Sequence, residues 1–250
     1  MVSGRGWQRI GPDPAIARWA EAALPVARAA IAATTETWRC GGTWLVGLDA
    51  LPNAPDGSIA GVPLPWEVLG LRPEPLHPAQ LSTIRPGYPQ PSEGETPAAF
   101  AFRRNRGAAH LDGLIADATG RRRIAEPHGW ILGLPLTDCS PDAAPLTIWE
   151  GSHVILRAAL LAALAPYPPE SWGTVDITDA YTAARRQCFE TCRRVDVAAR
   201  PGAAILMHHL CLHGVSPWGE TAGETATAPP EGRIIAYFRP QLASVRDWLA

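Results

Sequence analysis

Residues 203–213, AAILMHHLCLH, are the stretch on which the prediction of the fold depends. The segment is largely apolar and lies between the turn-forming pair Pro201-Gly202 and Gly214, a pattern typical of a buried β-strand. Successive side chains of a strand point to opposite faces, so His209 and His213 are predicted to share one face. The segment therefore predicts a core strand that ends by presenting His213 to the interior.

Short segments of similar character recur along the chain, and few helical patterns interrupt them. Further strand candidates lie at residues 43–48, 81–85, 98–104, 130–137, 145–149, 194–199 and 233–239. Helical periodicity is found at residues 13–33, 153–164 and 177–193. Many short strands with few helices favour a mainly β protein, a sandwich or barrel with helical decoration, over alternating β and α units.

Two of these helices carry recognisable start signals. Asp13 followed by Pro14 predicts an N-cap with proline in the first turn, and Pro25 is expected to kink or split this N-terminal helix. Thr178 and Asp179 predict the start of the helix at 177–193.

Composition limits the classes of function. The 250 residues fit a single domain, residues 1–250, and the net charge of −2 argues against nucleic acid as a partner. No apolar run approaches the ~18 residues of a membrane span, and the N-terminus lacks the apolar segment of a signal peptide. We therefore expect a cytoplasmic protein that acts on a small molecule, with neither a membrane nor nucleic acid as partner; its oligomeric state stays open. All 22 basic residues are arginine, so an anion would be bound by arginine or protonated histidine.

The triplet His110-Leu111-Asp112 is the candidate for chemistry. On a strand, side chains at i and i+2 point the same way, so His110 and Asp112 could bind one ion together. A third ligand distant in sequence must then come from a neighbouring strand, and His213 is the candidate. Two histidines and one carboxylate are the facial triad that binds non-haem Fe(II) and leaves coordination positions open. The simpler interpretation is a hydrogen-bonded loop pair without a metal.

Four segments, in their order along the chain, resemble the phytanoyl-CoA dioxygenase family of 2-oxoglutarate-dependent Fe(II) oxygenases. They are residues 109–113, AHLDG; residues 133–138 and 144–153, GLPLTD and APLTIWEGSH; Pro201-Gly202 with His213-Gly214; and residues 232–238, GRIIAYF. The chain departs from the family at Ala143-Ala144, where Asn-Gly is usual, and at Glu150, where proline is usual. Its gap between His213 and Arg233 is also longer, and the polar segment 219–232 accounts for the surplus.

The resemblance implies a double-stranded β-helix (jelly-roll, cupin-like) core in which His110, Asp112 and His213 bind Fe(II). Arg233, at the start of the last core strand, would bind the far carboxylate of the cosubstrate 2-oxoglutarate, and Arg239 on the same strand is the alternative. The implied reaction couples decarboxylation of 2-oxoglutarate to succinate with hydroxylation of a small organic metabolite by dioxygen. Halogenating relatives lack the carboxylate ligand, so the presence of Asp112 implies hydroxylation or an oxidation derived from it.

Two other classes of function compete with this one. A jelly-roll binding protein could retain a non-catalytic metal site, and a hydrolase or isomerase could use Zn²⁺ on the same ligands. Retention of His110, Asp112, His213 and Arg233 together counts against the first. The second would have no use for an arginine that binds a dicarboxylate.

The remaining histidines and the arginine-rich segments allow further interpretations. His209 is predicted to line the pocket, His208 to face the opposite side, and His153 to be structural at the start of a helix. Paired or clustered arginines occur at residues 103–106, 121–123, 185–186 and 193–194. They favour an anionic substrate, whereas the alternative is that they form solvated faces of loops and helices.

Overall fold

The computed structural model describes residues 4–219, 229 and 231–250, so the polar segment predicted at 219–232 lies almost entirely outside the described residues. The strands are β1 (Trp7–Ile10), β2 (Trp44–Leu51), β3 (Ala79–Ile84), β4 (Leu114–Ala116), β5 (Arg122–Ile124), β6 (Trp130–Pro135), β7 (Leu146–Trp149), β8 (Arg194–Val197), β9 (Ala204–His208), β10 (His213–Val215) and β11 (Arg233–Phe238). The helices are α1 (Pro14–Ala33), α2 (Trp66–Leu69), α3 (Pro97–Asn105), α4 (Ser152–Leu164), α5 (Thr178–Thr191) and α6 (Val245–Trp248), with a 3-10 helix at Pro169–Thr174.

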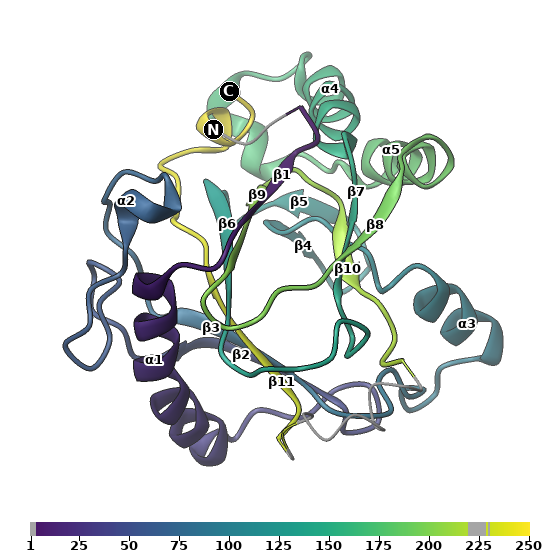
Figure 1. The fold of residues 1–250 in the computed structure, drawn as a ribbon. Coiled ribbons are helices and arrows are strands. Elements are labelled where there is room, and N and C mark those ends of the chain that lie inside the picture. Colours follow the sequence, from purple (N-terminus) through teal and green to yellow (C-terminus); the bar gives the residue numbers. More distant parts are fainter. Residues whose placement is uncertain (1–3, 220–228, 230) are drawn as a thin grey trace.

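Two antiparallel sheets face each other (Figure 1). The larger has six strands in the order β1-β9-β6-β11-β3-β2, and the smaller has three in the order β10-β7-β8. From β3 onward the chain passes back and forth between them, because β3, β6, β9 and β11 belong to the larger sheet and β7, β8 and β10 to the smaller. The exceptions are β7 and β8, which follow each other in the smaller sheet, and β4 and β5, which pair in a two-stranded sheet of their own. A single bridge at His110 extends the smaller sheet beyond β10. This alternation is that of a double-stranded β-helix, and it confirms the predicted fold.

The side chains of β11 show how the strands divide the molecule into layers. Ile234 and Phe238 face outward and pack with α1, where the rings of Phe238 and Trp19 meet edge to face at 5.7 Å. Arg233 and Tyr237, on the other face of the same strand, line cavities between the two sheets. The inner core is filled by apolar residues of both sheets, among them Ile131, Ile205 and Met207 of the larger and Leu146, Ile148 and Val197 of the smaller.

Helices cover the outer faces of both sheets (Figure 1). α1 lies against the larger sheet, and α4 and α5 pack with Trp149 of the smaller one. The Asp13 carboxylate accepts a hydrogen bond from the Ala15 amide at 2.7 Å, which confirms the predicted N-cap. α1 continues through Pro25, so the predicted split does not occur. The cap of α5 is also different from the prediction, because Asp176 accepts the amide and hydroxyl hydrogen bonds of Thr178.

Two predicted strands are wrong. Residues 98–104 belong to α3, which the Thr96 hydroxyl caps by accepting from the Ala99 amide at 3.2 Å, with Pro97 in the first turn. Residues 203–213 are split into β9 and β10 by a turn, in which the Cys211 amide donates to the His208 carbonyl at 2.8 Å. The turn carries the chain from the larger sheet to the smaller one.

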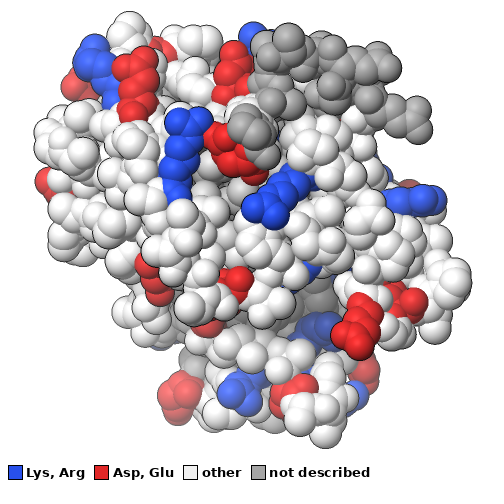
Figure 2. Space-filling view, turned by 90° about the horizontal axis from the view of Figure 1, so that it is seen from below, with Lys and Arg blue, Asp and Glu red and all other residues white. Residues whose placement is uncertain are grey.

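None of the described helices is long and apolar enough to span a membrane. On the face shown in Figure 2, arginine and acidic side chains are interspersed among uncharged residues, and the part that is described there forms no continuous area of one charge.

Candidate metal centre

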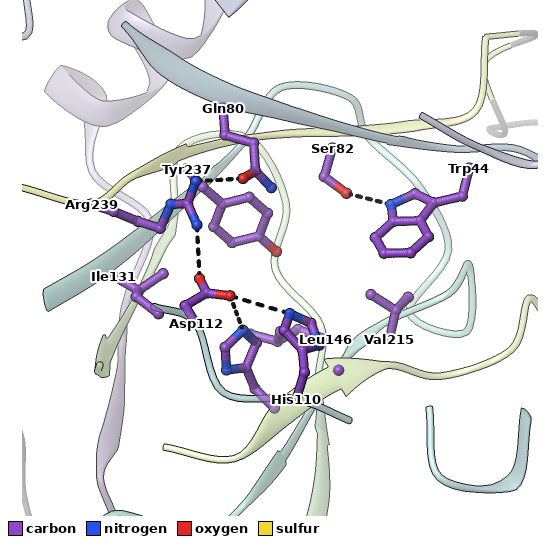
Figure 3. Close-up of a pocket in the computed structure, with 12 residues that line it drawn as sticks. Trp44, Gln80, Ser82, His110, Asp112, Ile131, Leu146, Val215, Tyr237 and Arg239 are labelled. Atoms are coloured by element: carbon purple, nitrogen blue, oxygen red, sulfur yellow. Dashed lines mark hydrogen bonds and ion pairs between the residues drawn. The ribbon is translucent and has the colours of Figure 1, made fainter. Parts of the chain in front are cut away.

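The structure brings His110, Asp112 and His213 together between the sheets. One ligand atom from each of the three lies within 4.8 Å of the other two. Nε2 of His110 is 3.3 Å and Nε2 of His213 is 3.8 Å from the same carboxylate oxygen, Oδ1 of Asp112 (Figure 3). Among the described residues, this is the one group of at least three histidine, cysteine or acidic side chains with such spacing. The structure therefore places the three predicted ligands around one point.

Backbone pairing brings the two histidines together. The His110 amide donates to the His213 carbonyl at 2.8 Å, and the His213 amide donates to the His110 carbonyl at 3.2 Å. His213 begins β10, so the third ligand comes from a neighbouring strand, as predicted. Asp112, however, lies in a turn and not on a strand, and Gly113 follows it at φ +88°. A Cβ at Gly113 would lie 2.6 Å from the Glu126 carbonyl oxygen, so this turn needs glycine.

A backbone carbonyl fixes the tautomer of each histidine. Nδ1 of His110 is 3.1 Å from the Ala108 carbonyl oxygen, and Nδ1 of His213 is 2.9 Å from the Cys211 carbonyl oxygen. A carbonyl oxygen only accepts, so each Nδ1 carries the proton in the neutral ring. Each Nε2 then faces Oδ1 of Asp112, and a metal ion at this point would replace the proton that His110 shares with the carboxylate. Such an outer hydrogen bond is what orients a metal-binding histidine.

The charges around this point favour a cation. Burial lowers the pKa of His213 to about 4, which keeps its imidazole neutral. Burial alone would raise the pKa of Asp112, but its hydrogen bond with His110 and the neighbouring positive charges bring the pKa well below its usual range. Burial likewise opposes protonation of His110, yet the hydrogen bond and charge of Asp112 raise its pKa. The ionised carboxylate thus attracts positive charge to the point that the two Nε2 atoms face.

Arg239 is bonded to the other oxygen of the same carboxylate. Its Nη1 donates to Oδ2 of Asp112 at 3.1 Å, and its Nη2 donates to Oε1 of Gln80 at 2.7 Å (Figure 3). The side chain of Arg239 is 11% exposed, and that of Asp112 is 15% exposed. The pair leaves Oδ1 directed toward the two histidines. The sequence predicts Arg239 only as an alternative residue for binding 2-oxoglutarate, and not as a partner of Asp112.

Arg233 lies in an adjoining cavity. The residue is 7% exposed, and its Nε and Nη2 atoms have no hydrogen-bond partner among the described residues. Its cavity is also lined by Thr137 and Cys139, whereas Tyr237 lines the cavity of the three ligands. The side chains of Arg233 and Tyr237 are hydrogen-bonded. Burial raises the pKa of Tyr237, and this hydrogen bond and the charge of Arg233 oppose that rise. Tyr237 therefore connects Arg233 with the metal centre.

Further side chains complete the cavity. Residues of both sheets line it: Trp44, Gln80, Ser82, Ile131, Leu146, Val215 and Tyr237. The Trp44 indole donates to the Ser82 hydroxyl at 3.2 Å, which fixes its ring against one wall (Figure 3). Sequence periodicity could have placed these residues on inward faces, but only the packing of the two sheets brings them to one cavity.

His209 does not line this cavity, contrary to the prediction. The strand ends at His208, and the turn that follows directs His209 toward α6, where its Nε2 donates to the Trp248 carbonyl at 2.7 Å. The rings of His208 and His209 are 4.4 Å apart, and those of His153 and His208 are 4.9 Å apart. These three histidines form a separate stack beside the metal centre.

No family model matches the sequence, and no curated protein sequence matches it significantly. Solved structures are similar at low identity. The non-heme alpha ketoglutarate dependent carbocyclase SnoK from nogalamycin biosynthesis is 13% identical over 98% of this chain and 85% of its own, with a TM-score of 0.48. AviO1 from Streptomyces viridochromogenes is 13% identical over 96% and 91% (TM-score 0.41), and EctD from S. alaskensis with bound Fe is 14% identical over 94% and 73% (TM-score 0.42).

Proposed function

We propose that this chain is a non-haem Fe(II), 2-oxoglutarate-dependent dioxygenase that hydroxylates a small organic molecule. The observation that carries the proposal is the convergence of His110, Asp112 and His213, with both Nε2 atoms and one carboxylate oxygen facing one point. Two imidazoles and one carboxylate are the donor set of the facial triad for Fe(II). The three ligands would occupy one side of the ion and leave the cavity side open.

Arg233 supports 2-oxoglutarate as the cosubstrate. A buried guanidinium with two nitrogens, Nε and Nη2, that lack acceptors is costly, and a carboxylate that offers two oxygens would satisfy both. Arg239 has less capacity for this role because Asp112 and Gln80 already accept its hydrogen bonds. We therefore assign the far carboxylate to Arg233 and the support of the metal ligand to Arg239.

When bound, Fe(II) and 2-oxoglutarate supply the oxidising chemistry, which inserts one oxygen atom of dioxygen into a C–H bond as 2-oxoglutarate becomes succinate and carbon dioxide. The chain's own part is to bind, orient and exclude water. Asp112, ionised and held by Arg239, and the two imidazoles, oriented by the Ala108 and Cys211 carbonyls, present a preorganised donor set. Trp44, Tyr237 and the apolar wall of Leu146 and Val215 limit access of water to the reacting atoms.

The test is an anaerobic titration with Fe(II) and 2-oxoglutarate. Bidentate chelation of Fe(II) by a 2-oxo acid gives a weak visible charge-transfer band, and we expect it in the wild type and not in His110→Ala. His153→Ala is the matched control, because His153 lies outside the cavity, and it should retain the band. A zinc hydrolase on the same ligands would bind metal without the band. Absence of the band in the wild type, or its persistence in His110→Ala, would refute the proposal.

A further inference from the structure

A second cavity opens beside the metal centre and shares His110, Asp112 and Arg239 with it. Its outer part is lined by two more arginines, Arg122 of β5 and Arg185 of α5. The sequence pairs these with other arginines in clusters at 121–123 and 185–186. Within each cluster only one arginine, Arg122 or Arg185, lines the cavity, and its sequence neighbours do not.

Neither arginine has a carboxylate partner among the described residues. Arg121, by contrast, pairs with Asp176, Arg103 with Glu95, and Arg239 with Asp112. Arg185 has a buried Nε without a hydrogen-bond partner in the described part of the chain, and its guanidinium lies 5.2 Å from the ring centre of Phe189.

Arg122 likewise forms no ion pair with a described acidic residue. Its guanidinium makes a 3.4 Å hydrogen bond to the Gly120 carbonyl and lies 6.0 Å from the ring centre of Tyr181. Glu126 also lines the cavity, but it is exposed and forms no ion pair with either arginine. The cavity is therefore lined by two guanidinium groups that form no ion pair with a described carboxylate.

Packing holds both arginines in place near the metal ligands. Tyr181, one turn before Arg185 on α5, is buried and its hydroxyl contacts the backbone of Leu111, which lies between the ligands His110 and Asp112. Arg122 is fixed by its strand, since its amide donates to the Thr178 hydroxyl at 2.6 Å at the start of α5. The two guanidinium groups are thus carried by elements that pack directly on the ligand segment.

Resting on the proposed function, we propose that the substrate is an organic anion whose carboxylate or phosphate group binds between Arg122 and Arg185, with its carbon chain directed toward His110 and Asp112. Guanidinium groups recognise the oxygens of both kinds of anion through paired hydrogen bonds. Partly exposed Leu114, which lines the same cavity, offers apolar surface to the carbon chain. The role of the two arginines is to select the substrate and set its orientation.

The experiment measures binding of three six-carbon probes, hexanoate, hexyl phosphate and 1-hexanol, by calorimetry without oxygen. The protein is loaded with Fe(II) and saturating 2-oxoglutarate, so that the inner arginine is already occupied. We expect at least one anion to bind at least tenfold more tightly than hexanol. The comparison of hexanoate with hexyl phosphate tells which anionic group is preferred. The double variant Arg122→Gln/Arg185→Gln should remove this preference and keep the charge-transfer band of the metal centre.

The matched control is Arg123→Gln/Arg186→Gln, which removes the same charge from the exposed neighbours on the same two elements. It should bind the anions as the wild type does. Equal binding of hexanol and both anions, or an equal loss in the control, would overturn the anion site while the band still supports the metal centre. Anion binding that depends on Arg122 and Arg185 in a protein without the band would instead support the anion site and refute the proposed function.

Discussion

His110 and His213 exchange both of their backbone hydrogen bonds, at 2.8 and 3.2 Å, and this pairing holds their imidazole rings 4.7 Å apart. The two metal ligands are therefore joined by the same interaction that extends the smaller sheet. The fold sets the separation of their backbones, and the Nδ1 hydrogen bonds to the Ala108 and Cys211 carbonyls orient the two rings. A site of this kind is organised before the metal binds, which is a requirement for precise catalysis.

Gly214→Ala should damage this pairing. A Cβ at Gly214 would lie 2.1 Å from the Gly107 carbonyl oxygen and 3.1 Å from Cα of Ala109, so backbone and not a flexible side chain would have to move. We expect a loss of stability of roughly 1–3 kcal/mol, as for other overpacked sites, together with weaker metal binding. Chemical denaturation and a metal titration measure the two effects. Gly11→Ala is the control, because a Cβ there meets nothing within 4 Å; equal effects of both variants would contradict the explanation.

Metal binding should stabilise the folded chain. A ligand that binds only the native state at about 100 times its Kd adds about 2.7 kcal/mol of stability, and excess EDTA should reverse the gain. Differential scanning calorimetry with Zn²⁺, which is not oxidised in air, measures the shift in Tm. His213→Ala should lose the shift, because one of the three converging ligand atoms is removed. A shift of the same size in this variant would mean that the metal binds elsewhere.

Stability should fall below neutral pH because of the stacked histidines. Burial, with the charges of His209 and His153, lowers the pKa of His208 in the folded state to about 3, whereas an unfolded histidine has a pKa of about 6.5. Between these values the unfolded chain binds more protons, so the free energy of unfolding decreases as the pH falls from about 6.5 toward 3.

His208→Asn tests this assignment by urea denaturation across that pH range. The Leu210 amide donates to Nδ1 of His208 at 3.1 Å, and the side-chain oxygen of asparagine can accept this hydrogen bond instead. Asparagine itself does not titrate. Below pH 6.5, the free energy of unfolding of the variant should fall less steeply with decreasing pH than that of the wild type. Between about pH 7 and 8 the two curves should have the same slope. Identical slopes below pH 6.5 would show that the buried imidazole of His208 is not responsible.

The three residues of the candidate metal centre could be predicted from sequence, whereas the contacts that support them could not. The H-x-D spacing and the glycine after His213 are local signals, and the resemblance to a family gave their order. The break after His208 has no such signal, because the segment stays apolar while the chain passes from one sheet to the other. The predicted strand at 98–104 is wrong for a related reason: the prediction gave more weight to the apolar composition of this segment than to the helix-start signal at Thr96 and Pro97. Pairing of Arg239 with Asp112 joins residues 127 positions apart and depends on the tertiary fold.

Arg233 of β11 and Arg239, which directly follows this strand, should separate metal binding from cosubstrate binding. Arg239→Gln removes the charged partner of Asp112, and loss of such an outer contact usually weakens metal affinity by roughly 10–100-fold. Arg233→Gln leaves Asp112 and its partners intact, so Fe(II) should bind normally while the affinity of the loaded protein for 2-oxoglutarate falls by at least tenfold. Calorimetry with Fe(II) and then 2-oxoglutarate under anaerobic conditions resolves the two steps. Arg123→Gln, an exposed arginine on β5, is the control for loss of charge. If Arg239→Gln mainly weakened 2-oxoglutarate binding and Arg233→Gln did not, the roles of the two arginines would be the reverse of those assigned.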